Sequence, residues 1–207
     1  MKYVVAGVGK FGRLAVERLL SAREATSILV AEKDSEKTRG EGRPGVVVRN
    51  SDAVSLLVES RGIASDDVIL PMVPFHLAAA YLLAATKGLS ETCLPASVVA
   101  LVPNPVRVDV STLCCSRADF ICPDDCPEGD RCTITGLPRD PLYAHLAELN
   151  IPGFQMVVLR SCQILPGLGG YSFGDLLDLG DRIGPGKYVV ATSCKCHGIM
   201  TAVEKTA

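Results

Sequence analysis

The chain has 207 residues, enough for one large domain or a domain with an insertion, and 48% of them are hydrophobic, which excludes a disordered chain. The formal net charge is −2 and 5% of the residues are aromatic, which argues against a nucleic-acid partner, because such partners need a basic surface or stacking platforms. An export signal is not expected, because the apolar start ends at Gly7 and is followed by Lys10 and Arg13, so we expect a cytoplasmic protein.

Strand-like and helix-like patterns alternate along residues 1–102. Short apolar runs predict buried strands at residues 3–6, 28–31, 46–48, 68–70 and 97–102, and helical spacing predicts helices at 10–20, 53–58 and 77–85. This alternation predicts an α/β fold with a doubly wound, mostly parallel, Rossmann-like sheet. Prolines at 71 and 74 interrupt the most apolar stretch, residues 68–83, so no stable membrane span is expected.

The alternation stops between residues 109 and 140, where five cysteines, several aspartates and three prolines predict an irregular cysteine-rich insert. It returns afterwards with predicted helices at 141–149 and 173–179 and predicted strands at 155–160 and 187–192. We therefore expect three parts. They are a nucleotide-binding half at 1–108, a metal-binding insert at 109–140, and α/β units at 141–207 that complete the sheet.

A glycine pattern, G-x-G-x-x-G, follows the first predicted strand and opens the first predicted helix. In that context the glycines allow a tight turn, close approach of a pyrophosphate and close helix packing, and the helix N-terminus attracts the phosphates. The predicted cofactor contacts are Gly7, Gly9, Lys10, Phe11, Gly12, Glu32 and Asp34. Glu32 would bind a ribose 2′-hydroxyl, with Asp34 as the reserve, which favours NAD over NADP. The alternative is a glycine turn that only packs a helix on a sheet.

Three segments of the first half carry a resemblance to a known family. Residues 6–15 (AGVGKFGRLA), 30–34 (VAEKD) and 62–69 (GIASDDVI) resemble the NAD-binding domain of the TrkA-type potassium-uptake regulators. The resemblance covers about the first 70 to 100 residues. It implies that Gly7, Gly9 and Gly12 hold a pyrophosphate and that Glu32 holds a ribose.

Cysteine spacing predicts a metal centre. Three cysteines form C-x3-C-x5-C in the insert, and C-x-C-H follows the last predicted strand; the predicted ligands are Cys122, Cys126, Cys132, Cys194, Cys196 and His197. Thiolates with an imidazole favour zinc over an iron–sulfur cluster, and redox-active or free thiols are a third alternative. For Cys93, and secondarily for Cys114 and Cys162, the alternative explanation is a buried small hydrophobic side chain.

If all the strands are parallel, the glycine turn and the C-x-C-H motif lie at one edge of one sheet, and the insert could close a shared site there. The general-base candidates at that edge are Cys196, His197, His76 and Tyr171, with His76 and His145 also explained as structural. A second glycine-rich loop before residue 173 could bind an anion or be a flexible connection; its contacts would be Gly167, Gly169, Gly170 and Ser172.

These features give three hypotheses. The first is an NAD-linked oxidoreductase or redox protein with a Cys/His-ligated zinc or iron–sulfur centre. The second is a TrkA-like regulatory protein that responds to nucleotide and metal without catalysis. The third is a purely structural metal that holds the insert. A small molecule or a partner protein would be the ligand, and a homo-oligomer stays open.

Overall fold

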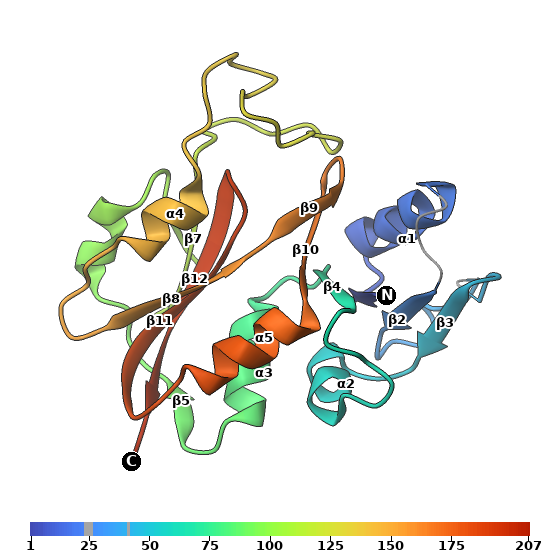
Figure 1. Cartoon of the computed structure of the whole chain (residues 1–207), viewed down its shortest axis with the longest axis horizontal. Coiled ribbons are helices and arrows are strands. Elements are labelled where there is room, and N and C mark those ends of the chain that lie inside the picture. The colour runs from blue at the N-terminus through green and yellow to red at the C-terminus, as the bar shows by residue number, and fades with distance from the viewer. Residues whose placement is uncertain (23–26, 41) are drawn as a thin grey trace. The chain divides into compact units, whose positions relative to one another are not determined.

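The computed structural model describes residues 1–22, 27–40 and 42–207 (Figure 1). Backbone contacts divide the chain into two compact units. The first comprises Met1–Ala85 and Gly170–Leu177, and the second comprises Thr86–Gly169 and Asp178–Ala207. Each unit buries apolar side chains of its own.

Four parallel strands form the main part of the first unit. They are β1 (Tyr3–Ala6), β2 (Ile28–Ala31), β3 (Val46–Arg49) and β4 (Val68–Pro71), in the spatial order β3-β2-β1-β4. All residues of β1 and β2 are buried, as expected where a parallel sheet is covered on both faces. These strands agree with the predicted ranges to within one residue.

The helices of the first unit follow its strands along the chain. They are α1 (Lys10–Ala22), α2 (Ala53–Glu59) and α3 (Leu77–Ala85) (Figure 1). Helix α1 buries Gly12, Ala15, Val16 and Leu19, which lie on one face at helical spacing. Helix α2 begins where the Asp52 carboxylate accepts hydrogen bonds from the amides of residues 54 and 55, at 2.9 and 3.2 Å.

The second glycine-rich segment was predicted to be a loop, but most of it forms a strand, so the predicted secondary structure is wrong. Strand β10 (Leu168–Ser172) pairs antiparallel with β4, with Tyr171 opposite Ile69. A Cβ on Gly170 would lie 2.6 Å from the Ile69 carbonyl oxygen, so this glycine allows the two strands to approach. Helix α5 (Phe173–Asp181) begins directly after β10, and the Ser172 hydroxyl accepts a hydrogen bond from the Asp175 amide at 2.9 Å.

The other two glycines of that segment also have structural explanations. Gly167 has φ +75° in the turn before β10, where its amide donates to the Cys126 carbonyl at 2.9 Å. A Cβ on Gly169 would lie 2.8 Å from the Ser161 hydroxyl oxygen. Close packing therefore accounts for this glycine-rich sequence without an anion.

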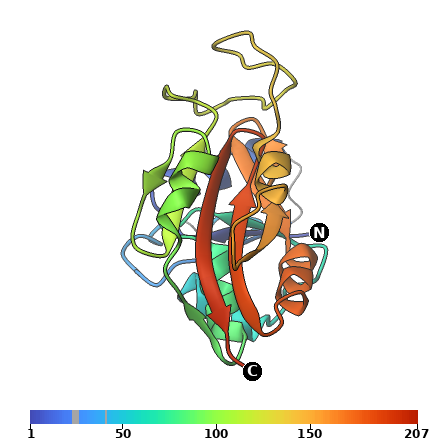
Figure 2. The same cartoon turned by 90° about the vertical axis from the view of Figure 1, so that its left-hand side faces the viewer.

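The second unit is built on a mostly antiparallel sheet in the order β6-β7-β12-β11-β8, with β5 paired to β12. The strands of this sheet are β5 (Leu89–Glu91), β6 (Val106–Arg107), β7 (Thr112–Ser116), β8 (Gln155–Arg160), β11 (Gly186–Ser193) and β12 (His197–Lys205). The second unit also contains β9 (Cys162–Leu165), which pairs with β10. Strands β8 and β11 run parallel, whereas β11 and β12 form a long antiparallel pair (Figure 2). The 3-10 helix η1 (Ala96–Leu101) and helix α4 (Leu142–Ala147) complete the unit. Its core includes Leu113, Leu142, Leu146, Val189 and Met200.

The predicted doubly wound, mostly parallel Rossmann-like fold is wrong. The described chain has two mixed sheets, one of order β3-β2-β1-β4-β10-β9 and the other described above. The physical reason is connection length: residues 194–196 alone join β11 to β12, whereas a parallel crossover needs a dozen or more residues. The expectation of one shared edge, which required all strands to be parallel, therefore fails.

Two further element predictions are wrong. Residues 97–102 are not a strand, because η1 covers this stretch and buries Val98 while Val99 and Leu101 stay exposed. The predicted irregular insert is too long at its start, because β7 lies inside it and its Leu113 is fully buried. None of the helices among the described residues is long and apolar enough to cross a membrane.

Candidate functional site

The glycine turn, residues 7–12, connects β1 to α1 in the first unit. Gly7 has φ +92°, and a Cβ there would lie 2.9 Å from the Met72 carbonyl oxygen. A Cβ on Gly12 would lie 2.0 Å from the Gly7 carbonyl oxygen, a distance that no side chain can reach. Both glycines are therefore required by the packing of the turn itself.

Gly9 differs from the other two glycines of the turn. Its φ lies outside the left-handed region, and a Cβ built on it would have no atom within 4 Å. Its carbonyl accepts a hydrogen bond from the Arg13 amide at 3.1 Å, so Gly9 is the N-cap of α1. Neither backbone conformation nor protein packing requires a glycine here, and the space before the helix N-terminus is open.

The residues that follow Gly9 are solvent-exposed. The Phe11 side chain is 55% exposed, and the Lys10 ammonium lies 5.4 Å from the centre of its ring. The first amides of a helix lack intrahelical acceptors, so this end of α1 offers donors and a positive dipole end to an anion.

Glu32 follows β2 and contacts the glycine turn. Its Oε2 accepts a hydrogen bond from the Val8 amide at 3.1 Å, and its Oε1 accepts one from the Asp34 amide at 3.0 Å. The Glu32 carboxylate therefore lies beside the glycine turn, the position predicted from the sequence. Each of its oxygens keeps a second acceptor position.

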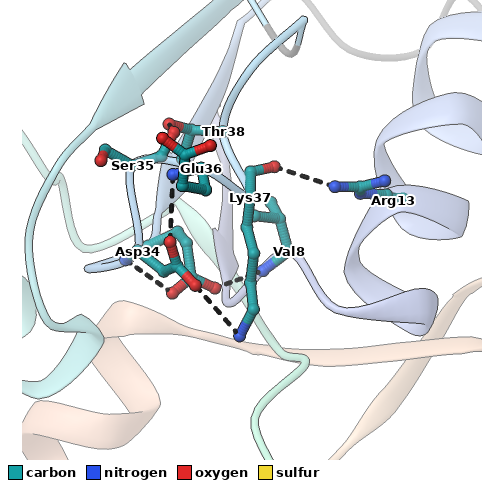
Figure 3. Close-up of polar contacts among 8 residues, drawn as sticks. Val8, Arg13, Asp34, Ser35, Glu36, Lys37 and Thr38 are labelled. Carbon is teal, nitrogen blue, oxygen red and sulfur yellow. Dashed lines mark hydrogen bonds and ion pairs between the residues drawn. The ribbon is translucent and has the colours of Figure 1, made fainter.

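The loop after Glu32 is held against α1. The Arg13 guanidinium donates to the Lys37 carbonyl at 3.1 Å, and the Lys37 ammonium lies 3.8 Å from the Asp34 carboxylate (Figure 3). Asp34 also accepts a hydrogen bond from the Glu36 amide at 3.0 Å. Asp34 is therefore engaged in its own loop, which leaves Glu32 as the acid nearest the turn.

Two of the general-base candidates are buried in the first unit. Burial lowers the pKa of His76 to about 3, so its ring is neutral near pH 7, and its carbonyl accepts a hydrogen bond from the Ala80 amide at the start of α3. Burial raises the pKa of Tyr171, whose hydroxyl has no hydrogen-bond partner among the described residues. A buried neutral imidazole and a buried phenol make poor proton carriers at neutral pH.

A second group of candidate residues lies in the second unit, on the cysteine loop, residues 117–141, and on the β11–β12 turn, residues 194–196. Both ends of the loop are hydrogen-bonded to this turn: the Arg117 amide donates to the Cys196 carbonyl at 2.7 Å, and the Leu142 amide donates to the Lys195 carbonyl at 2.8 Å. In the middle of the loop, the Glu128 carboxylate accepts a hydrogen bond from the Lys195 amide. The β11–β12 turn is therefore the anchor of the loop.

Four thiols gather around one guanidinium. Arg139 Nη2 donates to Cys126 Sγ at 3.2 Å, and its side chain also hydrogen-bonds Cys132. Burial raises the pKa of Cys122, and the neighbouring Cys126 and Cys132 raise it further, whereas Arg139 lowers it. Burial likewise raises the pKa of Cys196, Arg139 lowers it, and Glu128, Cys122 and Cys126 raise it.

His197 lies between Cys122 and a fifth thiol, Cys194. Its Nε2 is 3.6 Å from Cys122 Sγ, and its Nδ1 is 4.0 Å from Cys194 Sγ. Cys122 and Cys194 therefore lie beside His197, and Cys126 and Cys132 lie beside Arg139. The predicted metal site stays a prediction. All nine cysteines are free; outside this group, Cys115 is buried, Cys114 is partly buried, and Cys93 and Cys162 are exposed.

Two of the sulfurs accept backbone amides in the same pattern. Cys194 Sγ accepts from the amides of residues 196 and 197, at 3.4 and 3.3 Å. Cys132 Sγ accepts from the amides of residues 134 and 135, and the hydrogen bonds from Thr135 lead the causes that lower the pKa of Cys132 to about 7. Burial nevertheless raises the pKa of Cys194 to about 12.

Sequence reasoning missed Arg139 and Glu128. Neither has a diagnostic spacing from the cysteines, and both reach the group through the folding of the loop. Among the described residues, no set of three or more His, Cys, Asp or Glu side chains is arranged closely enough to hold a metal ion as it stands. A depression of about 500 Å³, lined by Lys2, Gly62 and Asp67 among others, lies at the amino ends of β1 and β4, the end opposite the glycine turn.

Comparisons with known proteins cover part of the chain. A curated uncharacterized protein of Archaeoglobus fulgidus is 31% identical over 148 residues, which cover 67% of this chain and 66% of the relative. The chain therefore spans just under two thirds of the length of that relative. No solved structure matches the chain.

The family comparison overturns the predicted resemblance to the TrkA-type regulators, because no TrkA-type or Rossmann NAD-binding family is found. A short glycine pattern with an acid after the next strand is shared by many unrelated chains, so it identified no family. The matching model covers residues 74–206, which include the cysteine loop, the β11–β12 turn and β12. The chain belongs to the family described as "Uncharacterized protein, C-terminal domain".

Proposed function

We propose that the glycine turn of the first unit binds the pyrophosphate of a dinucleotide, NAD in preference to NADP. The observation that carries the proposal is Gly9, where open space replaces any structural need for a glycine. A pyrophosphate that approaches the backbone closely explains a glycine at this position, and the N-terminus of α1 supplies amides and a positive dipole end.

Glu32 supports the choice of NAD. The Val8 amide holds its carboxylate beside the turn, and the remaining acceptor positions suit the hydroxyls of an adenine ribose. A 2′-phosphate in the same place would be repelled by the charges of Glu32 and Asp34.

Equilibrium titrations of the full chain with NADH and with NADPH test the proposal. We expect NADH to bind more tightly by about tenfold or more, equivalent to about 1.4 kcal/mol. Glu32→Gln should narrow this preference, because the neutral amide no longer repels a 2′-phosphate. Asp66→Asn is the matched control, since Asp66 is exposed at the opposite end of β4. Absence of NADH binding below about 1 mM would refute the proposal.

We extend the proposal to redox chemistry, in which the nicotinamide would transfer a hydride. NADH oxidation with an artificial electron acceptor is the assay, with the Gly9→Ala variant of the glycine turn as the comparison. Turnover that falls in the variant would support an oxidoreductase. Binding without turnover would support a nucleotide-responsive regulatory role instead.

A further inference from the structure

The cysteine loop is not stabilised by a hydrophobic core of its own. Its apolar side chains point into solvent: Ile121 is 97% exposed, Leu137 is 64% exposed and Ile134 is 56% exposed. Apart from an isolated bridge between Arg131 and Pro138, the loop contains no strand or helix. An ordered loop of this length needs another constraint, because fixing each residue costs about 1–2 kcal/mol of conformational entropy.

The constraint available in this region is sulfur. The loop contributes Cys122, Cys126 and Cys132, and the β11–β12 turn, which anchors both ends of the loop, contributes Cys196. Arg139 hydrogen-bonds both Cys126 and Cys132, and Cys122 Sγ lies 3.6 Å from Nε2 of His197, the residue that follows Cys196. They come from segments more than 60 residues apart in sequence, so a bridge between them would fasten the loop to the sheet.

Hydrogen-bond donors reach several of the sulfurs. Two backbone amides reach Cys132 in the loop, and two reach Cys194 in the β11–β12 turn. Arg139, which cannot lose its proton in a protein, donates to Cys126 and hydrogen-bonds Cys132. Thiolates, rather than thiols, are the form that binds metal.

We propose that Cys122, Cys126, Cys132 and Cys196 bind one Zn²⁺ ion, which fastens the cysteine loop to the β11–β12 turn. Four sulfurs match the closed tetrahedral coordination of structural zinc. Four thiolates around Zn²⁺ leave a net charge of −2, and the guanidinium of Arg139 offsets part of it. His197 Nε2 lies 3.6 Å from Cys122 Sγ and orients that ligand, while Cys194 Sγ lies 4.0 Å from His197 Nδ1 and is not one of the four proposed ligands.

Binding requires the sulfurs to close to about 2.3 Å from the ion. The Arg139 guanidinium hydrogen-bonds Cys126 and Cys132. On zinc binding it would turn outward and keep these hydrogen bonds on the side of the sulfurs away from the ion. The exposed loop has few packed side chains to oppose this movement. The site is independent of the proposed nucleotide function, which involves the first unit, so failure of one leaves the other intact.

Zinc content and affinity of the full chain test the proposal. The chain is purified without oxygen, its zinc, iron and sulfide are measured, and its Zn²⁺ affinity is obtained by competition with a chromophoric chelator. Cys126→Ser and Cys196→Ser remove proposed ligands, whereas Cys194→Ser and Cys162→Ser are the controls, one beside the site and one on the exposed surface. Far-UV circular dichroism reports whether each variant still folds.

We expect one zinc per chain in the natural protein and in both controls. In the two ligand variants we expect the Zn²⁺ affinity to fall by more than about 100-fold, which exceeds the effect of losing a residue that only hydrogen-bonds a ligand. If a ligand variant does not fold, Co²⁺ bound to the natural protein should still show thiolate-to-metal absorption. Loss of zinc in Cys194→Ser with retention in Cys196→Ser would overturn the ligand set. Iron with sulfide would overturn zinc, and absence of any bound metal would overturn the site.

Discussion

Replacement of Gly9 by alanine separates the proposed binding role of the glycine turn from its structural role. The added Cβ would meet no atom within 4 Å, so the fold has room for it. Alanine is a poorer N-cap than glycine, which lowers the free energy of unfolding by up to about 1 kcal/mol. Alanine also restricts the unfolded chain, which raises the free energy of unfolding by about 0.4–1 kcal/mol. The two effects nearly cancel, and we expect the free energy of unfolding to change by less than about 1 kcal/mol.

The same methyl group would stand in the space that the pyrophosphate needs. We expect NADH affinity to fall by about tenfold or more, equivalent to about 1.4 kcal/mol. Gly12→Ala is the matched comparison, because its Cβ would lie 2.0 Å from the Gly7 carbonyl oxygen. Overpacking of that severity should destabilise the first unit by about 3 kcal/mol or more.

Urea unfolding and NADH titration, carried out on both variants, decide the question. A binding role for Gly9 is supported if Gly9→Ala keeps its free energy of unfolding and loses NADH affinity, while Gly12→Ala lowers the free energy of unfolding. A Gly9→Ala protein that binds NADH as tightly as the natural chain would refute the role given to Gly9. A strongly destabilised Gly9→Ala protein would show that the open space is already needed by the fold.

Further predictions concern stability and the thiol group. Tyr171→Phe removes a buried hydroxyl without a partner among the described residues, so it should leave stability unchanged or raise it by about 1–3 kcal/mol in urea unfolding; a clear loss would reveal a hidden partner. The neutral form of His76 is favoured in the folded state, so its contribution is complete above pH 6.5 and decreases as the pH falls toward 3. Urea unfolding between about pH 6 and pH 4 should therefore show a slope smaller by about 1.4 kcal/mol per pH unit in His76→Gln, and an unchanged slope would contradict the assigned pKa. Asp52→Ala removes the cap of α2 and should cost about 0.5–2 kcal/mol, whereas Asp52→Asn should cost less. Arg139→Gln should weaken Zn²⁺ binding by about 10- to 100-fold, while an equal affinity would show that the guanidinium does not support the thiolates.

Local structure in the first unit could be predicted from the sequence because its apolar runs are short, complete and separated by clear turn residues. The runs at residues 3–6 and 28–31 have the length and composition of strands buried on both faces, and the glycine spacing at residues 7–12 is typical of a tight turn between a strand and a helix. The position of Glu32 beside the turn follows from the pairing of β1 with β2, which the same pattern implied.

Long-range pairing in the second unit could not be predicted in this way. An apolar run does not show whether the neighbouring strand is parallel or antiparallel to it, so the sheet was expected to be parallel. The strands β12 and β7, which pair antiparallel, were not predicted. Glycines at 169 and 170 resembled a flexible loop, although they serve close contacts of β10 and its neighbouring segments. Direction depends on the length of connections and on partners distant in sequence, which local patterns do not contain.

For the candidate sites, the sequence by itself determined which residues have the right chemistry. It named the glycine turn, Glu32 and the six Cys/His side chains, since these residue types and spacings are properties of the chain. Only the tertiary structure decided which of them meet. The short β11–β12 turn reverses the chain and anchors both ends of the cysteine loop, and this places Arg139 among sulfurs that are distant in sequence. The spacing of residues determines which ligands a segment can bind. The antiparallel pairing of strands that are distant in sequence determines which other segments lie beside it and can share that ligand.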